Sequence, residues 1–301
     1  MNLERFEGCL LGLACGDAVG ATVEFVPRGR FEPLTDMMGG GKFRLQKGEW
    51  TDDTSMALCL AESLIECNGF DALDQMQRYW RWADEGYYSC RQHPVGMGKT
   101  VVAALIRFQK TGEPLSGSDS PDTSGNGSLM RLAPVAMFYA GNPAQVAYYA
   151  ALSSQTTHSS ADCLACCQYF ALVLQRALSG EQDKAALFPD TPDFAMDGAA
   201  ARILQQRFRH LGEADVIGSG YVVESLEAAL WAFWHTDSFE QAVLAAANLG
   251  DDADTTAAIC GQLAGAYYGV RAIPSHWLDC LYRAGDITIL AQRLARIPTA
   301  N

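Results

Sequence analysis

Two short acidic segments, about 200 residues apart, constrain the fold of this 301-residue chain more than any other feature. They read Thr51-Asp52-Asp53-Thr54 and Asp251-Asp252-Ala253-Asp254-Thr255. Packing so many carboxylates into helix starts is costly unless a cation neutralises them, so the two segments are best explained if they meet around shared ions. We therefore expect one domain over residues 1–301, in which the two segments form a single site.

Each segment taken alone also fits a simpler role as a helix cap. Asp and Thr are favoured N-caps, and the helix dipole stabilises acids in a first turn. A cap needs only one side chain, however, whereas these segments place several oxygens on each turn. The helices expected to follow, over residues 56–67 and 257–268, are apolar enough to be buried, so water would not solvate their first turns. A cation site is the better hypothesis.

The donor atoms available in the two segments are carboxylate and hydroxyl oxygens, without a neighbouring Cys or His. Such ligands suit Mg²⁺, Mn²⁺ or Ca²⁺ rather than zinc or copper. Six residues carry the candidate oxygens, which is enough for two ions in one site: Thr51, Asp52, Asp53, Asp252, Asp254 and Thr255.

Hydrophobic periodicity predicts a chain that is nearly all α-helical. Apolar residues recur three or four positions apart, as a buried helix face requires, and alternating strand patterns with hairpin turns are scarce. Helices are expected over residues 55–67, 72–82, 100–108, 129–139, 161–178, 223–234 and 239–247, and surface loops over residues 26–49, 110–128 and 179–198.

The composition excludes several classes of protein. A formal net charge of −13 argues against a surface for nucleic acid or an anionic membrane. The longest uncharged run, residues 255–270, is shorter than the roughly 18–20 residues that a membrane span needs, and no signal peptide is recognisable. Cys163, Cys166 and Cys167 resemble half of a zinc site with no second half. We expect a monomeric cytoplasmic protein with reduced thiols.

Six motifs follow one another along the chain in a distinctive order. They are Gly8-x-x-x-Gly12-x-x-x-Gly16-Asp17-Ala18-x-Gly20 leading to Glu24, Trp50-Thr51-Asp52-Asp53-Thr54, Gly125-Asn126-Gly127-Ser128-x-Met130-Arg131, Thr157-His158, Gly220-Tyr221-Val222, and Gly250 to Thr255 followed by Gly261-x-x-x-Gly265. In this order the chain resembles the ADP-ribosylglycohydrolase family over nearly its whole length. Any single motif would be weak evidence, but the ordered set is specific.

The resemblance implies an all-α fold with a binuclear Mg²⁺ or Mn²⁺ centre, which the same six residues would hold. It implies hydrolysis of an ADP-ribosylated protein, with ADP-ribose as product, and identifies Glu24 as the catalytic carboxylate. The residues that would bind ADP-ribose are Asn126, Gly127, Ser128, Met130, His158, Gly220 and Tyr221. Arginine is the first expectation for the acceptor. An O-linked serine, a small guanidine, or a non-catalytic ADP-ribose-binding descendant are the alternatives.

The binding residues can also be read directly from their chemistry. The segment from Gly125 to Ser128 lacks a Cβ at alternate positions, so its amides can approach a diphosphate, helped by the helix start expected at residue 129; a flexible turn is the alternative. His158 suits a diphosphate or a cap, and Tyr221 suits adenine or the core. Asp17, in a tight Gly-Asp turn, more often has a structural role.

The chain departs from the family pattern at two places. The second acidic motif usually reads Gly-Gly-Asp-Thr-Asp-Thr, whereas this chain has Asp251 and Ala253 at the second and fourth positions. Neither is a main ligand, so metal binding should persist. Some arginine-directed members carry an acid in the segment that corresponds to residues 94–100, and this chain has none there. Recognition of a guanidinium is therefore open.

The Gly98-Lys99-Thr100 triplet is not a P-loop, because His93 stands where that motif needs glycine.

Overall fold

The computed structural model describes residues 2–296, and within this range the chain forms α-helices, short 3₁₀ turns and loops without a β-strand. The predicted all-α fold is confirmed; residues 1 and 297–301 of the predicted domain lie outside the described range. The α-helices are α1 (Leu3–Gly20), α2 (Asp52–Glu66), α3 (Ala72–Glu85), α4 (Lys99–Thr111), α5 (Ala133–Phe138), α6 (Pro143–Gln155), α7 (Ala161–Leu178), α8 (Ala201–Leu204), α9 (Val222–Trp234), α10 (Phe239–Ala247), α11 (Ala253–Tyr268), α12 (Ser275–Cys280) and α13 (Ala284–Arg296).

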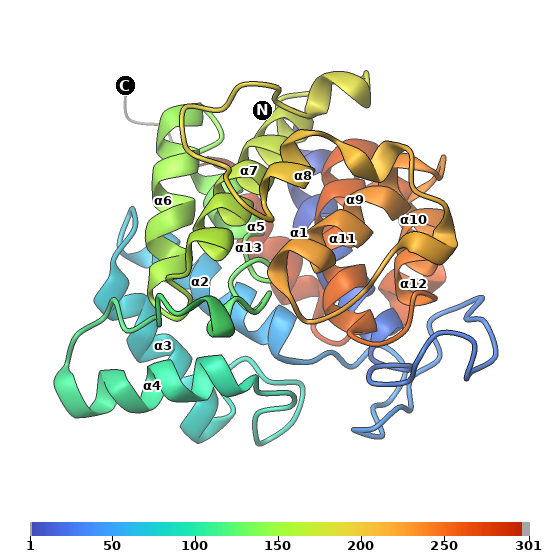
Figure 1. Cartoon of the computed structure of the whole chain (residues 1–301). Coiled ribbons are helices and arrows are strands. Elements are labelled where there is room, and N and C mark those ends of the chain that lie inside the picture. Colours follow the sequence, from blue (N-terminus) through green and yellow to red (C-terminus); the bar gives the residue numbers. More distant parts are fainter. Residues whose placement is uncertain (1, 297–301) are drawn as a thin grey trace.

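Helices α1 and α11 lie against each other at the centre of the fold (Figure 1). Gly8 of α1 faces Gly265 of α11 and Gly20 faces Ala253, so the two helices run antiparallel. Small residues every fourth position bring the two backbones into contact, and a Cβ added to Gly261 would overlap the carbonyl oxygen of the facing glycine on α1. The end of α1 and the start of α11 therefore lie at the same end of the pair.

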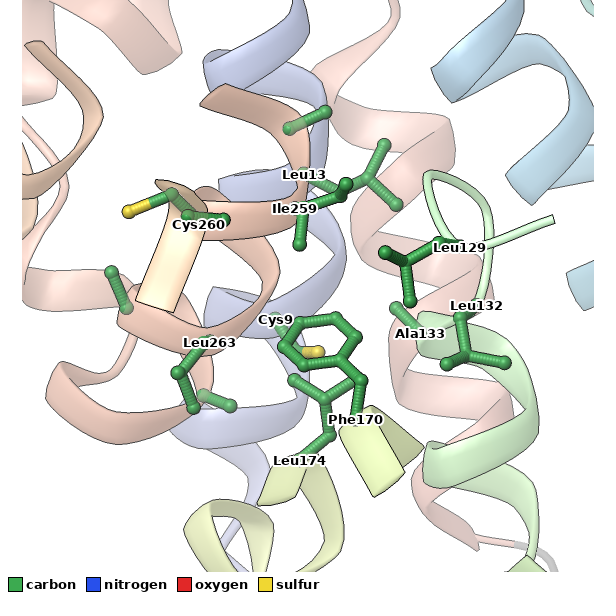
Figure 2. Packing of buried hydrophobic residues seen from close by; sticks show 14 of the residues in the cluster. Cys9, Leu13, Leu129, Leu132, Ala133, Phe170, Leu174, Ile259, Cys260 and Leu263 are labelled. Atoms are coloured by element: carbon green, nitrogen blue, oxygen red, sulfur yellow. The ribbon is translucent and has the colours of Figure 1, made fainter. Parts of the chain in front are cut away.

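Several of the other helices pack against this pair. Helices α9 and α10 pack against α11, whereas α13, α2 and α5 lie on the other side of α1 (Figure 1). Figure 2 shows Phe170 of α7 beside Cys9 of α1, with Leu263 of α11 near them; all three side chains are buried. Burying such an apolar side chain stabilises the fold by about 1.5–3 kcal/mol. A smaller cluster, which includes Tyr79 and Trp82, joins α3 and α4 to α2.

Most predicted helices are present, with ends shifted by a few residues. Those predicted over residues 161–178 and 239–247 match α7 and α10 at both ends. The helix predicted from residue 129 is wrong at its start, because residues 126–131 form turns and α5 begins only at Ala133. Helices α1, α6 and α13, and the short helices α8 and α12, were not predicted. No helix within the described range is long and apolar enough to cross a bilayer.

The contact between α1 and α11 makes Gly261→Ala a strongly destabilising substitution. The added methyl would meet backbone atoms of α1, which cannot move aside as a side chain can. We expect a loss of about 3 kcal/mol or more in the free energy of unfolding, measured by guanidinium denaturation.

Gly285→Ala in α13 is the matched control, because a Cβ there meets no atom within 4 Å. It should raise stability by about 0.5–1 kcal/mol through helix propensity. Equal effects of the two substitutions would contradict the close approach of α1 and α11.

Candidate active site

The two acidic segments meet where α1 ends and α11 begins. Oxygens of Glu24, Asp252 and Asp254 lie within 4.8 Å of one another, and so do oxygens of Asp17, Asp53 and Asp254. The hydroxyl of Thr51 lies 3.2 Å from Asp53 Oδ2 and 3.5 Å from Asp254 Oδ2, so it touches both segments. The structure thus brings residues from distant parts of the sequence into one cluster of oxygens.

Capping does not account for these acids, because Asp17 of α1 caps α2 instead. Its Oδ2 accepts hydrogen bonds from the Thr54 amide at 3.0 Å and hydroxyl at 2.6 Å, and its Oδ1 accepts from the Thr51 amide at 2.9 Å. The N-cap residues themselves, Thr51 of α2 and Asp252 of α11, make no side-chain cap bond. Capping therefore does not explain why the two acidic segments carry so many oxygens, and Asp17 has the structural role expected for it.

Burial and charge crowding strain the cluster when no cation is bound. Burial is the largest cause of a raised pKa at Glu24, to about 8, with repulsion from Asp252 adding to it. Burial and the charge of Asp17 raise the pKa of Asp52 to about 7. Two buried carboxylate oxygens, Glu24 Oε2 and Asp53 Oδ1, have no hydrogen-bond partner among the described residues. Carboxylate oxygens without a hydrogen-bond partner, crowded together in this way, are suitable ligands for divalent cations such as Mg²⁺ or Mn²⁺.

A cavity of about 400 Å³ opens onto this cluster. Of the residues predicted from the sequence, its lining includes Glu24, Asp52, Asn126, Gly127, Met130, His158, Gly220, Asp252, Asp254 and Thr255. Thr51, Asp53 and Ser128 are buried and are not part of the lining. Tyr221 lines an adjoining hollow of about 290 Å³ that shares Gly125 and Gly220 with the main cavity.

Hydrogen bonds fix the loop around Asn126 to the acidic cluster. The Asn126 side-chain amide donates to Asp252 Oδ2 at 2.6 Å, and its backbone amide donates to the Gly220 carbonyl at 3.1 Å. The Tyr221 hydroxyl donates to Asp162 Oδ2 at 2.6 Å, which holds the ring at the edge of its hollow. Since no helix starts at residue 129, any anion bound here would meet loop amides rather than the expected helix N-terminus.

Several lining residues were not predicted, because none carries a chemical motif: Phe25, Lys42, Phe43, Gly96, Met97 and Gly98 come from irregular segments, and Thr100 and Val101 come from the first turn of α4. Phe25 is 55% exposed, and the Lys42 ammonium lies 4.1 Å from the centre of its ring. A side chain at Gly96 would overlap Asp52 Oδ1, so only glycine leaves this part of the cavity open.

Comparison with known proteins agrees with this geometry. The sequence model of the family described as ADP-ribosylglycohydrolase matches residues 1–300. The chain belongs to the ADP-ribosylglycohydrolase family. It is 40% identical over 293 residues to the ADP-ribosylarginine hydrolase Tri1 of Serratia proteamaculans, covering 97% of this chain and 79% of that protein.

Other ADP-ribosylglycohydrolases are similar over most of their length. The ADP-ribosyl-[dinitrogen reductase] glycohydrolase of Rhodospirillum rubrum is 33% identical, with 92% of this chain and 90% of that protein covered. A solved structure titled "ADP-ribosylglycohydrolase-related protein complex" superposes with a TM-score of 0.85 at 40% identity, covering 99% of each chain. The protein is therefore an enzyme of the ADP-ribosylglycohydrolase class.

The departure at Asp251 from the family's second motif has a backbone explanation. Asp251 has φ +53°, a left-handed conformation that glycine adopts without strain and that Asp tolerates better than most residues. Its amide donates to Val26 O at 3.0 Å and its carbonyl accepts from the Phe25 amide at 2.6 Å. Because its side chain is exposed, Asp251 anchors the Glu24 loop through its backbone and lies outside the cavity lining.

The crowded carboxylates predict that the metal-free protein loses stability as pH rises. Their folded pKa values lie above the unfolded values near 4, so the folded state retains protons that the unfolded state releases, up to about pH 8. The cost is roughly 1.4 kcal/mol per pH unit for each retained proton. Chemical denaturation in a chelator at pH 6.5 and 8.0 measures this dependence. His158, whose pKa is lowered from about 6.5 to about 3, has the opposite effect, and most of that effect lies below pH 6.5.

Two controls sharpen this measurement. Glu24→Gln removes one titrating group and should flatten the dependence on pH. Added Mn²⁺ should reverse it, since a cation displaces the retained protons and binds more tightly at higher pH. A metal-free protein that becomes more stable between pH 6.5 and 8.0 would contradict the raised pKa values.

Proposed function

We propose that the protein hydrolyses the bond between C1 of the distal ribose and an arginine side chain of an ADP-ribosylated protein, in a metal-dependent reaction that releases ADP-ribose. The observation that carries the proposal is the unpartnered Glu24 oxygen, held beside Asp252 and Asp254 in the cavity. The arginine linkage is supported by the names of two relatives, the ADP-ribosylarginine hydrolases Tri1 of Serratia proteamaculans and Pseudomonas putida, at 40% and 41% identity.

Two cations, Mg²⁺ or Mn²⁺, would be held by Thr51, Asp52, Asp53, Asp252, Asp254 and Thr255. When bound they would orient the ribose 2- and 3-hydroxyls and polarise the sugar. The binding residues are fixed before any ligand arrives, because Asp17 holds the first turn of α2 and Asn126 holds Asp252.

Glu24 would act on the water that attacks the ribose. As a carboxylate it would take one proton from that water while the water oxygen bonds to C1 and the bond from C1 to the acceptor nitrogen breaks. The acceptor leaves with the bonding electron pair and gains a proton. A neighbouring cation would favour the ionised form of Glu24 and oppose the effect of burial on its pKa.

The remaining predicted residues would bind the rest of ADP-ribose. The amides of Gly127 and Ser128, together with His158, suit the diphosphate, and Met130 and Gly220 line the cavity between the loops. Tyr221 would stack on adenine in the adjoining hollow, where its ring is half-buried and its hydroxyl is anchored.

The part of the cavity that would receive the arginine side chain offers an aromatic ring, rather than an extra acid, for contact with the guanidinium. The face of Phe25 already contacts one cation, the ammonium of Lys42, which is exposed and can move away. A planar guanidinium can take the same place over the ring. This contact would replace the acid that is missing from residues 94–100.

Asp254→Ala should abolish release of ADP-ribose from arginine-modified protein, because it removes a carboxylate shared by both acidic groups. The variant should also lose Mn²⁺ binding, measured by calorimetry, and keep its helical circular dichroism. Glu24→Gln should retain Mn²⁺ binding and lose at least about 10²-fold in kcat.

Asp251→Gly is the control, because that carboxylate lies outside the cavity, and it should retain turnover. Wild-type turnover in Asp254→Ala would overturn the metal assignment. No release of ADP-ribose from arginine- or serine-linked substrate with Mg²⁺ or Mn²⁺ would overturn the proposed activity.

Phe25→Ala should raise KM for an arginine-linked substrate by about 5- to 30-fold, the equivalent of a cation–π contact of about 1–2 kcal/mol. KM for a serine-linked substrate, which offers no cation, should stay within about twofold. Release from the serine linkage alone by the wild-type enzyme would refute the arginine assignment and leave ADP-ribosyl hydrolysis standing.

A further inference from the structure

Arg131 is a buried cation without an acidic partner. Its side chain is wholly inaccessible, and no carboxylate lies within 4.0 Å of it in the described part of the chain. Its guanidinium lies 4.7 Å from the centre of the Tyr79 ring and otherwise contacts mainly neutral oxygens. A buried charge without a counter-charge destabilises a fold, and an apolar side chain would be cheaper here. Stability alone therefore does not explain this residue.

The first consequence of this guanidinium is the orientation of the loop that lines the cavity. Arg131 Nη1 donates to the carbonyl of Gly127 at 3.0 Å. In a trans peptide the following amide, that of Ser128, points the opposite way, away from Arg131. Within residues 2–296 neither the Gly127 nor the Ser128 amide has an acceptor. Arg131 thus orients the peptide that carries the Ser128 amide, next to the Gly127 amide, which is also unpaired.

The second consequence is the tautomer of His158. Arg131 Nη2 donates to Thr157 Oγ1 at 2.8 Å, and that hydroxyl lies 2.7 Å from His158 Nδ1. Because Arg can only donate, the Thr157 oxygen accepts from it, and the one hydroxyl proton is free to go to Nδ1. The imidazole proton then resides on Nε2, the nitrogen nearest Gly125 and Gly127. Burial, followed by the charge of Arg131, lowers the pKa of His158 to about 3, so the ring is neutral.

We propose that Arg131 is a positioning residue for the diphosphate: it fixes the peptide between Gly127 and Ser128 in the cavity loop, directs the His158 Nε2–H toward the anion and supplies a positive charge that no carboxylate cancels. This inference rests on the proposed function, because it assumes that ADP-ribose is the ligand. The uncancelled charge matters in a chain of net charge −13, whose cavity is otherwise lined by carboxylates at its metal end.

The test compares Arg131→Met with Gln75→Met in the Mn²⁺-loaded enzyme. Gln75 is also wholly buried and donates to Ser153 O and Thr156 Oγ1, two acceptors that Arg131 shares, but it makes no hydrogen bond to Gly127 or Thr157. Calorimetry measures the Kd of ADP-ribose at several salt concentrations and the Kd of Mn²⁺. Chemical denaturation measures the stability of each variant.

Arg131→Met should weaken ADP-ribose binding by about 10- to 100-fold, the equivalent of one or two charge-assisted hydrogen bonds. Its ADP-ribose binding should depend less on salt than that of the wild type, and its affinity for Mn²⁺ should stay within about threefold. Gln75→Met should bind ADP-ribose within about threefold of the wild type. Arg131→Lys keeps the charge but cannot donate to Gly127 and Thr157 from two separate nitrogens. Its affinity for ADP-ribose should lie between those of Arg131→Met and the wild type.

Unchanged ADP-ribose binding in Arg131→Met, or equal weakening in both Met variants, would overturn the inference and leave the proposed function intact. A wild-type enzyme that binds Mn²⁺ and no ADP-ribose would overturn both. If Arg131→Met does not fold, Arg131→Lys becomes the test. An Arg131→Lys variant that binds ADP-ribose with the affinity and salt dependence of the wild type would refute the positioning role.

Discussion

The direct backbone contact between α1 and α11 is the constraint on which the rest of the structure depends. Because small residues line both helices, the antiparallel pair packs with Gly8 against Gly265 and Gly20 against Ala253. That register places the loop of Glu24, which follows α1, next to Asp252 at the start of α11. Asp17, one turn before the end of α1, then fixes the first turn of α2 and with it the other acidic segment. Three distant segments are thereby positioned by one interface.

The site is assembled at some cost to the stability of the fold. Carboxylates are buried close together, with orphaned oxygens at Glu24 and Asp53. Phe25 and Asp251 are both held at positive φ and joined by one hydrogen bond, from the Phe25 amide to the Asp251 carbonyl, and Arg131 is buried without a counter-charge. Such local strain is typical of functional sites that must be rigid before the ligand binds. The closely packed helix pair and its apolar surroundings offset it.

Much of this arrangement could be predicted from the sequence, and the failures have physical causes. Helices with one apolar face, such as α7 and α10, were visible in their periodicity, whereas α1 is buried on nearly every side and carries glycines that weaken the pattern. The acidic cluster was predictable because crowded oxygens need a partner wherever the chain folds. The turn after Gly127 was not, since it depends on the Asn126 carbonyl accepting from Leu129 and Met130. Phe25 joins the cavity only through tertiary contacts. Arg131 gives no sign in the sequence of being buried.

Because α1 and α11 are far apart along the chain, their contact can form only late in synthesis. Helix α1 is synthesised first and its glycine-lined face stays uncovered until α11, near the other end, has left the ribosome. Contacts between such distant segments form slowly and leave intermediates exposed to misassembly. A nascent chain carries Asp52 and Asp53 without Asp252 and Asp254, and so holds only half of the oxygen cluster. On the proposed function, cations would therefore be held only after α1 and α11 have met, and a chain that lacks α11 would lack half of their ligands.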